Sequence, residues 1–178
     1  LTLQSWVSPT TYYLTSLLLI LLATFVAAHY FQSKGLNPFW SLVWSLGFGT
    51  QITLLNGLPD AAADALLIIA LVSLLQRQRL LYAIAVTFAA LSREVYVLVP
   101  AVIAMVEFLS IVRARMGQVS LWQLLQAGLR QSTWHLPAIL AVVGWQIYLR
   151  LKFGVLPSAD ASNVLGLPFV ATYQYLIM

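Results

Sequence analysis

Long runs without a charged residue limit what this chain can fold into, and the first such run lies at residues 10–31. A helix needs roughly 20 apolar residues to cross a bilayer core, where only its own hydrogen bonds satisfy the backbone. Aromatic residues stand at both ends of the run, as they do at membrane interfaces: Tyr12 and Tyr13 at one end, Tyr30 and Phe31 at the other. We therefore expect residues 10–31 to form a spanning helix.

Composition extends this interpretation to the whole chain. Charged residues make up 8% of the 178 residues, whereas soluble domains carry roughly 25%, so most of the surface must face lipid. We predict an all-α fold: a polytopic transmembrane helical bundle in which residues 1–178 form a single domain, an internal piece of a longer membrane protein. The expected spans are residues 10–31, 36–55, 61–76, 80–92, 95–112 and 134–150, with an interfacial amphipathic helix at residues 119–130.

Three of these segments have special features. Residues 80–92 reach only about 20 Å, against a hydrocarbon core of roughly 30 Å, so they form either a shortened span or half of a broken helix. Pro100 predicts a kink in the span at 95–112. Residues 36–55 carry a small side chain at every fourth position, a pattern that lets helices pack closely in lipid. The residues of this expected packing stripe are Ser41, Ser45, Gly49 and Thr53.

Basic residues gather in the short segments between the spans, which indicates the orientation in the membrane. Such charges favour anionic lipid headgroups as partners, not nucleic acid. The chain has no cysteine, which excludes disulfides and thiolate metal sites. The expected inner side carries Lys34, Arg77, Arg79, Arg113, Arg115 and Arg130, and the expected outer side carries Arg93, Arg150 and Lys152.

Two aspartates at the start of the third span are candidates for chemistry. Asp60 and Asp64 are four residues apart, so they share a helix face at the expected outer membrane edge. Paired carboxylates there are candidates for a catalytic base or for binding a divalent cation such as Mg²⁺ or Mn²⁺. The alternative is that Asp60 caps the helix while Asp64 complements its dipole.

Arg93 and Glu94 separate two apolar segments on the same expected side as Asp60. An arginine in that position suits a phosphate or pyrophosphate group. The alternative is an interfacial ion pair that marks a helix boundary.

Three further ionisable residues have structural explanations. Glu107 lies within the fifth span, where we expect it to extend to the interface or to pair with Arg113 or a neighbouring helix. His29 and His135 stand at opposite ends of their helices, where a lone histidine usually makes a hydrogen bond and does not bind a metal.

The segment from Asn56 to Ala104 resembles a known family. Ala90-Leu91-Ser92-Arg93-Glu94, followed by an apolar helix with Pro100, is similar to a segment of the multi-spanning GT-C glycosyltransferases. That class includes bacterial relatives of protein mannosyltransferases and other enzymes that use polyprenyl-phosphate sugars. Residues Leu136 to Ser158 resemble a later segment of the same class, and together the two regions cover about half of the chain.

The resemblance implies an integral protein of the bacterial inner membrane that transfers a sugar, with inversion, from a polyprenyl-phosphate donor at the outer face. It implies Arg93 as a donor-phosphate contact, with Glu94, Asp60 and Asp64 lining the outer cavity. The catalytic acid of the class usually lies in the first outer loop, yet no acidic residue precedes Asp60 here. Either that loop lies before Leu1 or the chain lacks the activity.

Three functions are consistent with these observations. The first is a GT-C-type glycosyltransferase. The second is a non-catalytic subunit of a larger membrane complex, which the packing stripe and the missing early carboxylate fit. The third is a fragment of a transporter, for which the interrupted fourth and fifth segments are the indication.

Overall fold

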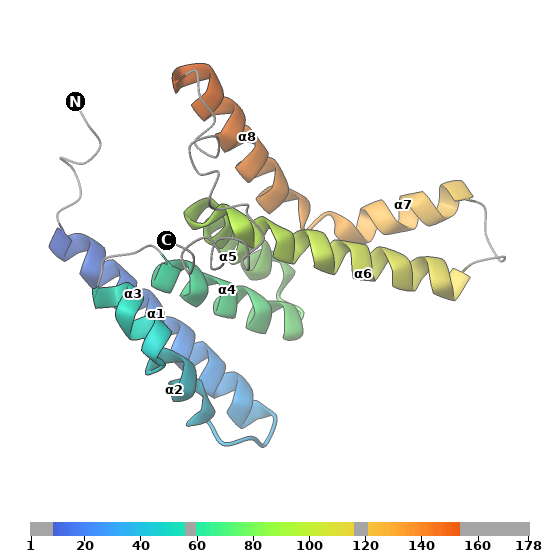
Figure 1. The fold of residues 1–178 in the computed structure, drawn as a ribbon. Coiled ribbons are helices and arrows are strands. Elements are labelled where there is room, and N and C mark those ends of the chain that lie inside the picture. Colours follow the sequence, from blue (N-terminus) through green and yellow to red (C-terminus); the bar gives the residue numbers. More distant parts are fainter. Residues whose placement is uncertain (1–8, 56–59, 116–120, 154–178) are drawn as a thin grey trace, which may run out of the picture. The chain divides into compact units, whose positions relative to one another are not determined.

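The computed structural model describes residues 9–55, 60–115 and 121–153 (Figure 1). In these ranges the chain consists of helices and turns with no strand, which confirms the all-α class. The residues fall into two compact units, with the boundary between Val142 and Val143. In chain order the elements are α1 (Pro9–Ser33), α2 (Trp40–Ser45), α3 (Phe48–Leu55), α4 (Asp60–Leu75), α5 (Arg79–Ser92), the 3₁₀ helix η2 (Glu94–Val97), α6 (Leu98–Arg115), α7 (Leu121–Ser132) and α8 (Leu136–Phe153).

Helix α1 covers the first expected span and is terminated by a glycine two residues beyond its end. Gly35 has a φ of 71°, in the left-handed region that glycine adopts without a steric penalty. The Leu36 N–H donates to the Phe31 carbonyl at 2.9 Å and the Gly35 N–H to the Gln32 carbonyl at 3.0 Å. These two bonds form a Schellman motif, which satisfies carbonyls that the end of the helix would leave unpaired.

The prediction of a single helix over residues 36–55 is wrong, because the structure has two short helices there. The break lies at Leu46 and Gly47, between α2 and α3. Two side chains satisfy the carbonyls that the break exposes: Thr50 Oγ1 donates to the Trp44 carbonyl and Gln51 Nε2 to the Ser45 carbonyl, both at 2.9 Å. A helix break in an apolar environment requires such partners.

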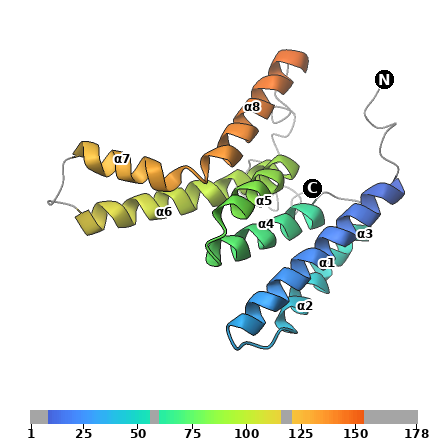
Figure 2. The same ribbon diagram turned by 180° about the vertical axis from the view of Figure 1, so that it is seen from behind.

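The closest packing in the first unit joins α4 and α5 in an antiparallel hairpin (Figures 1 and 2). Alanines fill this contact, and their small side chains let the two backbones approach. The other face of α4 packs on α1, where Ile20 and Ala23 are buried. The buried alanines of the hairpin are Ala61, Ala63, Ala65, Ala70, Ala83, Ala85, Ala89 and Ala90.

Arg77 closes the same hairpin in an unusual conformation. Its φ is 62°, although it is not a glycine. The Gln78 N–H donates to the Ser73 carbonyl at 2.8 Å and the Arg77 N–H to the Leu74 carbonyl at 3.0 Å, so α4 also ends in a Schellman motif.

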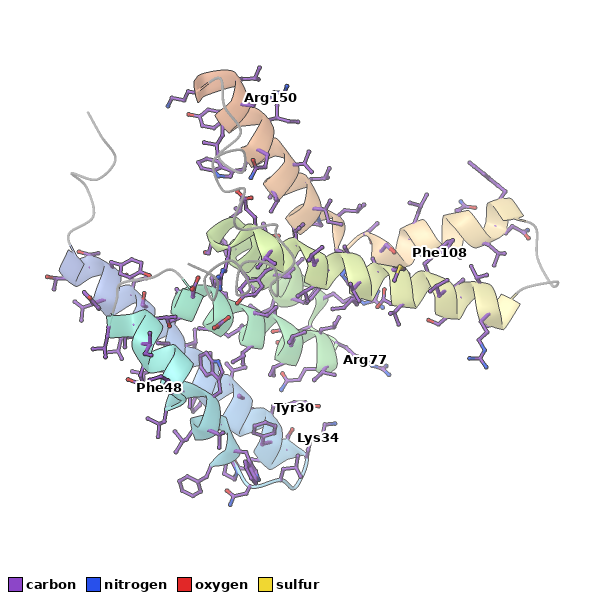
Figure 3. All side chains as sticks on the ribbon, viewed as in Figure 1. Tyr30, Lys34, Phe48, Arg77, Phe108 and Arg150 are labelled. Carbon is purple, nitrogen blue, oxygen red and sulfur yellow. The ribbon has the colours of Figure 1, made fainter. Side chains whose placement is uncertain are left out.

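Helix α6 follows η2 directly and packs against α7. Pro100 is the third residue of α6, where a proline removes no hydrogen bond that the helix needs, so the expected kink is replaced by the change from 3₁₀ to α geometry. Helix α7 begins near the start of the expected interfacial helix and is amphipathic. It buries Leu124 and Gly128, and a Cβ on Gly128 would lie 2.4 Å from Cδ2 of Phe108 on α6 (Figure 3).

Two stretches of the described residues are long and apolar enough to cross a membrane: Thr10–Ser33 and Glu94–Ala114. Arg79–Ser92 is apolar but shorter. In the most apolar part of each stretch, few residues are buried inside the protein: 22% of them in Thr10–Ser33 and 6% in Glu94–Ala114. Their apolar side chains therefore project outward (Figure 3).

The described part of the second unit is the end of α8. Trp145 and Tyr148 stack there with ring centroids 5.6 Å apart. The Lys152 ammonium donates to the Tyr148 hydroxyl at 2.9 Å. The last apolar run of the sequence, residues 169–178, lies outside the described residues.

Candidate functional site

Charged side chains meet where α4 begins and α5 ends. Asp60 is the first residue of α4, and Arg93 follows the last residue of α5. Because α4 and α5 are antiparallel, these two positions lie at the same end of the hairpin. Arg93 has extended backbone angles, φ −149° and ψ 109°, which end the helix. Its Nε lies 3.2 Å from Oδ1 of Asp60.

One turn further into α4, Asp64 has a partner from η2. The Tyr96 hydroxyl donates a hydrogen bond to Oδ1 of Asp64. The short 3₁₀ helix brings Tyr96 back over the start of α4, so both aspartates that the sequence singles out have a partner from the segment after α5. This hydrogen bond joins the hairpin to η2, directly before α6.

These groups border a hollow between α3 and the end of the hairpin, which we call the acidic hollow. Its volume is about 400 Å³, within the usual range for small-molecule sites. The side chain of Arg93 is 48% exposed and that of Asp60 20%, so the ion pair is accessible from the hollow. The lining consists of Val43, Trp44, Gly47, Gly49, Thr50, Thr53, Asp60, Asp64 and Arg93.

The structure brings together some of the residues predicted from the sequence and separates others. Glu94 is exposed at the start of η2 and is not part of the lining. The expected packing stripe is divided by the helix break: Ser41 and Ser45 are buried, whereas Gly49 and Thr53 line the hollow.

The two carboxylates of the acidic hollow already have side-chain partners. Mg²⁺ prefers several oxygen ligands in octahedral geometry, usually including a carboxylate. Here the carboxylate of Asp60 is neutralised by Arg93 and that of Asp64 accepts a hydrogen bond from Tyr96. Within the described ranges, no group of three histidine, cysteine or acidic residues is arranged to hold a metal ion.

A second polar cluster lies deep in the first unit. The Tyr82 hydroxyl of α5 is 2.6 Å from Nδ1 of His135, and Nε2 of His135 is 3.2 Å from Oε2 of Glu107 on α6. Tyr82 is 0% exposed and His135 1%. With the proton of a neutral imidazole on Nε2, Tyr82 donates to His135 and His135 donates to Glu107, so every group in the chain of bonds has a partner.

This cluster agrees in part with the sequence-based interpretation. His135 makes the hydrogen bond expected of it, although its side chain is buried in the protein, and Glu107 pairs with a neighbouring segment, through His135 and not Arg113. His29 is exposed on α1. Tyr82 is separated from His135 by 53 positions, and a tyrosine in an apolar run resembles many interface tyrosines, so the sequence carried no signal for this contact.

Comparison of the chain with models of known protein families, with curated proteins and with solved structures gives no match.

Proposed function

We propose that this chain is part of an integral membrane glycosyltransferase of the GT-C type, whose acidic hollow receives the phosphate and sugar of a polyprenyl-phosphate donor. The observation that carries this proposal is the accessible Arg93–Asp60 pair beside Asp64 in a hollow of about 400 Å³. A guanidinium fixed by a carboxylate is oriented to donate its remaining N–H groups to a phosphate.

Membrane insertion is supported by the outward faces of α1 and α6. On α1, Leu14, Leu18 and Leu21 are each more than 60% exposed and follow one another at helical spacing. A soluble monomer rarely exposes an apolar patch of this extent, whereas a lipid-facing helix requires it. Along α6, five apolar residues are each more than half exposed: Leu98, Val102, Met105, Val106 and Leu109.

In the proposed reaction, Arg93 binds the donor phosphate and Asp64 acts as the base. An acceptor hydroxyl displaces Tyr96 from Asp64 and attacks the anomeric carbon of the sugar. The bond between that carbon and the phosphate oxygen breaks, and the lipid phosphate leaves with its negative charge facing Arg93. The proton of the hydroxyl passes to Asp64. Asp60 holds Arg93 in position.

Two substitutions test these roles in the full-length protein. Arg93→Gln is expected to weaken binding of a long-chain polyprenyl phosphate by about tenfold, because one charge-assisted contact is lost. Arg150→Gln removes an exposed arginine of α8 and serves as the matched control. Asp64→Asn keeps an oxygen for Tyr96 but removes the base, so it should leave donor binding unchanged and lower sugar transfer by about a hundredfold.

A specific observation favours the second candidate, a non-catalytic subunit. Both aspartates already have partners, Arg93 and Tyr96, so the same contacts serve to hold α4, α5 and α6 together. In that case Asp64→Asn leaves sugar transfer by the intact complex unchanged, and Arg93→Gln lowers the thermal stability of the complex without changing polyprenyl-phosphate binding.

A further inference from the structure

A second polar depression lies near the opposite end of α5 from the acidic hollow. Helix α5 has 14 residues, which separates its two ends by about 21 Å. The depression, which we call the basic groove, has a volume of about 520 Å³ and is bordered by α5, α6 and α7. Its lining consists of Arg79, Ile111, Gln123, Gln126, Ala127, Arg130 and Gln131.

Charge in the basic groove is of one sign. Arg79 and Arg130 line it, and its lining includes no acidic residue. Neither arginine forms an ion pair with any carboxylate of residues 9–55, 60–115 and 121–153. Glu107, one turn before Ile111 on α6, is bonded to His135. Two arginines that line one depression without an acidic residue make its electrostatic potential positive, and an anion bound there would be stabilised.

Local helix geometry strengthens this preference for an anion. Arg79 is the first residue of α5, and the residue before it, Gln78, makes no side-chain cap. A basic residue at a helix N-terminus opposes the helix dipole, so Arg79 does not serve the stability of α5. The N-terminal end of α5 instead adds a second positive element beside the guanidinium.

The surroundings indicate where the anion comes from. Trp122 and Leu129 of α7 are 73% and 64% exposed, and their positions on the helix lie next to the face that carries Gln126 and Arg130. An amphipathic helix of this kind lies in the headgroup region of a membrane. The expected inner side of the chain carries both arginines, and that leaflet is rich in anionic lipid.

We propose that the basic groove binds a phosphate group, with Arg79 and Arg130 as its charged ligands and the side chains of Gln126 and Gln131 as further donors. The ligand class is a phosphate ester or free phosphate, and the apolar side chains beside the groove favour a lipid headgroup. This site is distinct from the acidic hollow and does not depend on the sugar-transfer proposal.

The test measures phosphate binding to the full-length protein, delipidated in a neutral detergent. All variants carry Arg93→Gln, so that a phosphate in the acidic hollow makes no contribution. The variant is Arg79→Gln with Arg130→Gln, and the matched control is Arg113→Gln, which removes an exposed arginine of α6 outside the groove. Since both groove arginines are exposed, folding is expected to persist, and circular dichroism checks this for each protein.

Two probes distinguish the sources of the phosphate. Mixed micelles with phosphatidylglycerol, compared with phosphatidylcholine, test a lipid headgroup, and inorganic phosphate tests a free anion. We expect phosphatidylglycerol to bind and the double variant to bind it at least about tenfold more weakly, with the Arg113→Gln control unchanged. Loss of inorganic phosphate binding in the double variant would also support the site and identify the free anion as its ligand. Equal binding by the double variant and the control, or no binding of either probe, would overturn the proposal.

Discussion

Removing the Tyr82 hydroxyl tests whether the buried cluster stabilises the fold. Tyr82→Phe keeps the ring, which fills a site that is 0% exposed, and deletes only the donor to Nδ1 of His135. His135 is 1% exposed, so water does not replace the lost bond and the imidazole keeps an unsatisfied acceptor. Leaving a buried acceptor unpaired costs about 1–3 kcal/mol, while hydrogen bonds between membrane helices average about 0.6 kcal/mol with a maximum near 1.7.

We expect Tyr82→Phe to lower the free energy of unfolding by about 1–2 kcal/mol. The measurement is reversible unfolding in mixed micelles, followed by circular dichroism as the fraction of denaturing detergent rises. Tyr148→Phe is the matched control, because it deletes an exposed hydroxyl that accepts a hydrogen bond from the Lys152 ammonium and should change the free energy by less than about 0.5 kcal/mol. Equal stability of Tyr82→Phe and the wild-type protein would refute the reasoning, since it would mean that the hydroxyl makes no net contribution.

The remaining predictions concern backbone and packing positions, each measured by the same unfolding assay. Gly128→Ala places a Cβ 2.4 Å from Phe108 Cδ2 and should destabilise the protein by about 1 kcal/mol after the gain in helix propensity, because overpacking costs about 1–3 kcal/mol. Gly144→Ala has open space around its Cβ, so the higher helix propensity of alanine should stabilise the protein by up to about 1 kcal/mol. A loss of stability equal to that of Gly128→Ala would contradict the packing argument. Arg77→Gly removes a non-glycine residue from a φ of 62° and should stabilise the protein by about 0.5–1 kcal/mol. Arg77→Ala keeps the Cβ and should give no such gain; a gain of the same size would assign the effect to lost charge.

Helices were predicted best where the type of residue changes abruptly at the end of an apolar run. The aromatic pairs and Gly35 bracket the first span, and α1 follows it closely. The loop from Gln76 to Gln78 separates α4 from α5 as expected, because basic and amide side chains interrupt the apolar run there. Strong local signals of this kind do not depend on the rest of the fold.

The break between α2 and α3 could not be predicted in the same way. Nearly every residue from Leu36 to Leu55 is apolar or small, so hydrophobic periodicity does not distinguish one helix from two. What decides the break is the pair of bonds from Thr50 and Gln51 to carbonyls six residues earlier, and such bonds form only after the chain has turned.

The candidate site was predicted in part for a comparable reason. Asp60, Asp64 and Arg93 were singled out because charges are rare in this chain, and rarity is visible in a sequence. Their partners were not, because Tyr96 becomes a partner of Asp64 only through the turn that η2 makes. The alanines of α4 and α5 also indicate close helix packing, and they are as visible in the sequence as the small residues at 41–53.

The break between α2 and α3, which side-chain hydrogen bonds stabilise, affects any molecule that enters the acidic hollow. Gly47 and Thr50 belong to both the break and the hollow wall, and Thr50 is held by its bond to the Trp44 carbonyl. This side of the hollow is consequently shaped before a ligand arrives. An incoming ligand would lose little affinity to ordering that wall, and any adjustment would have to occur on the opposite side, at the exposed Arg93.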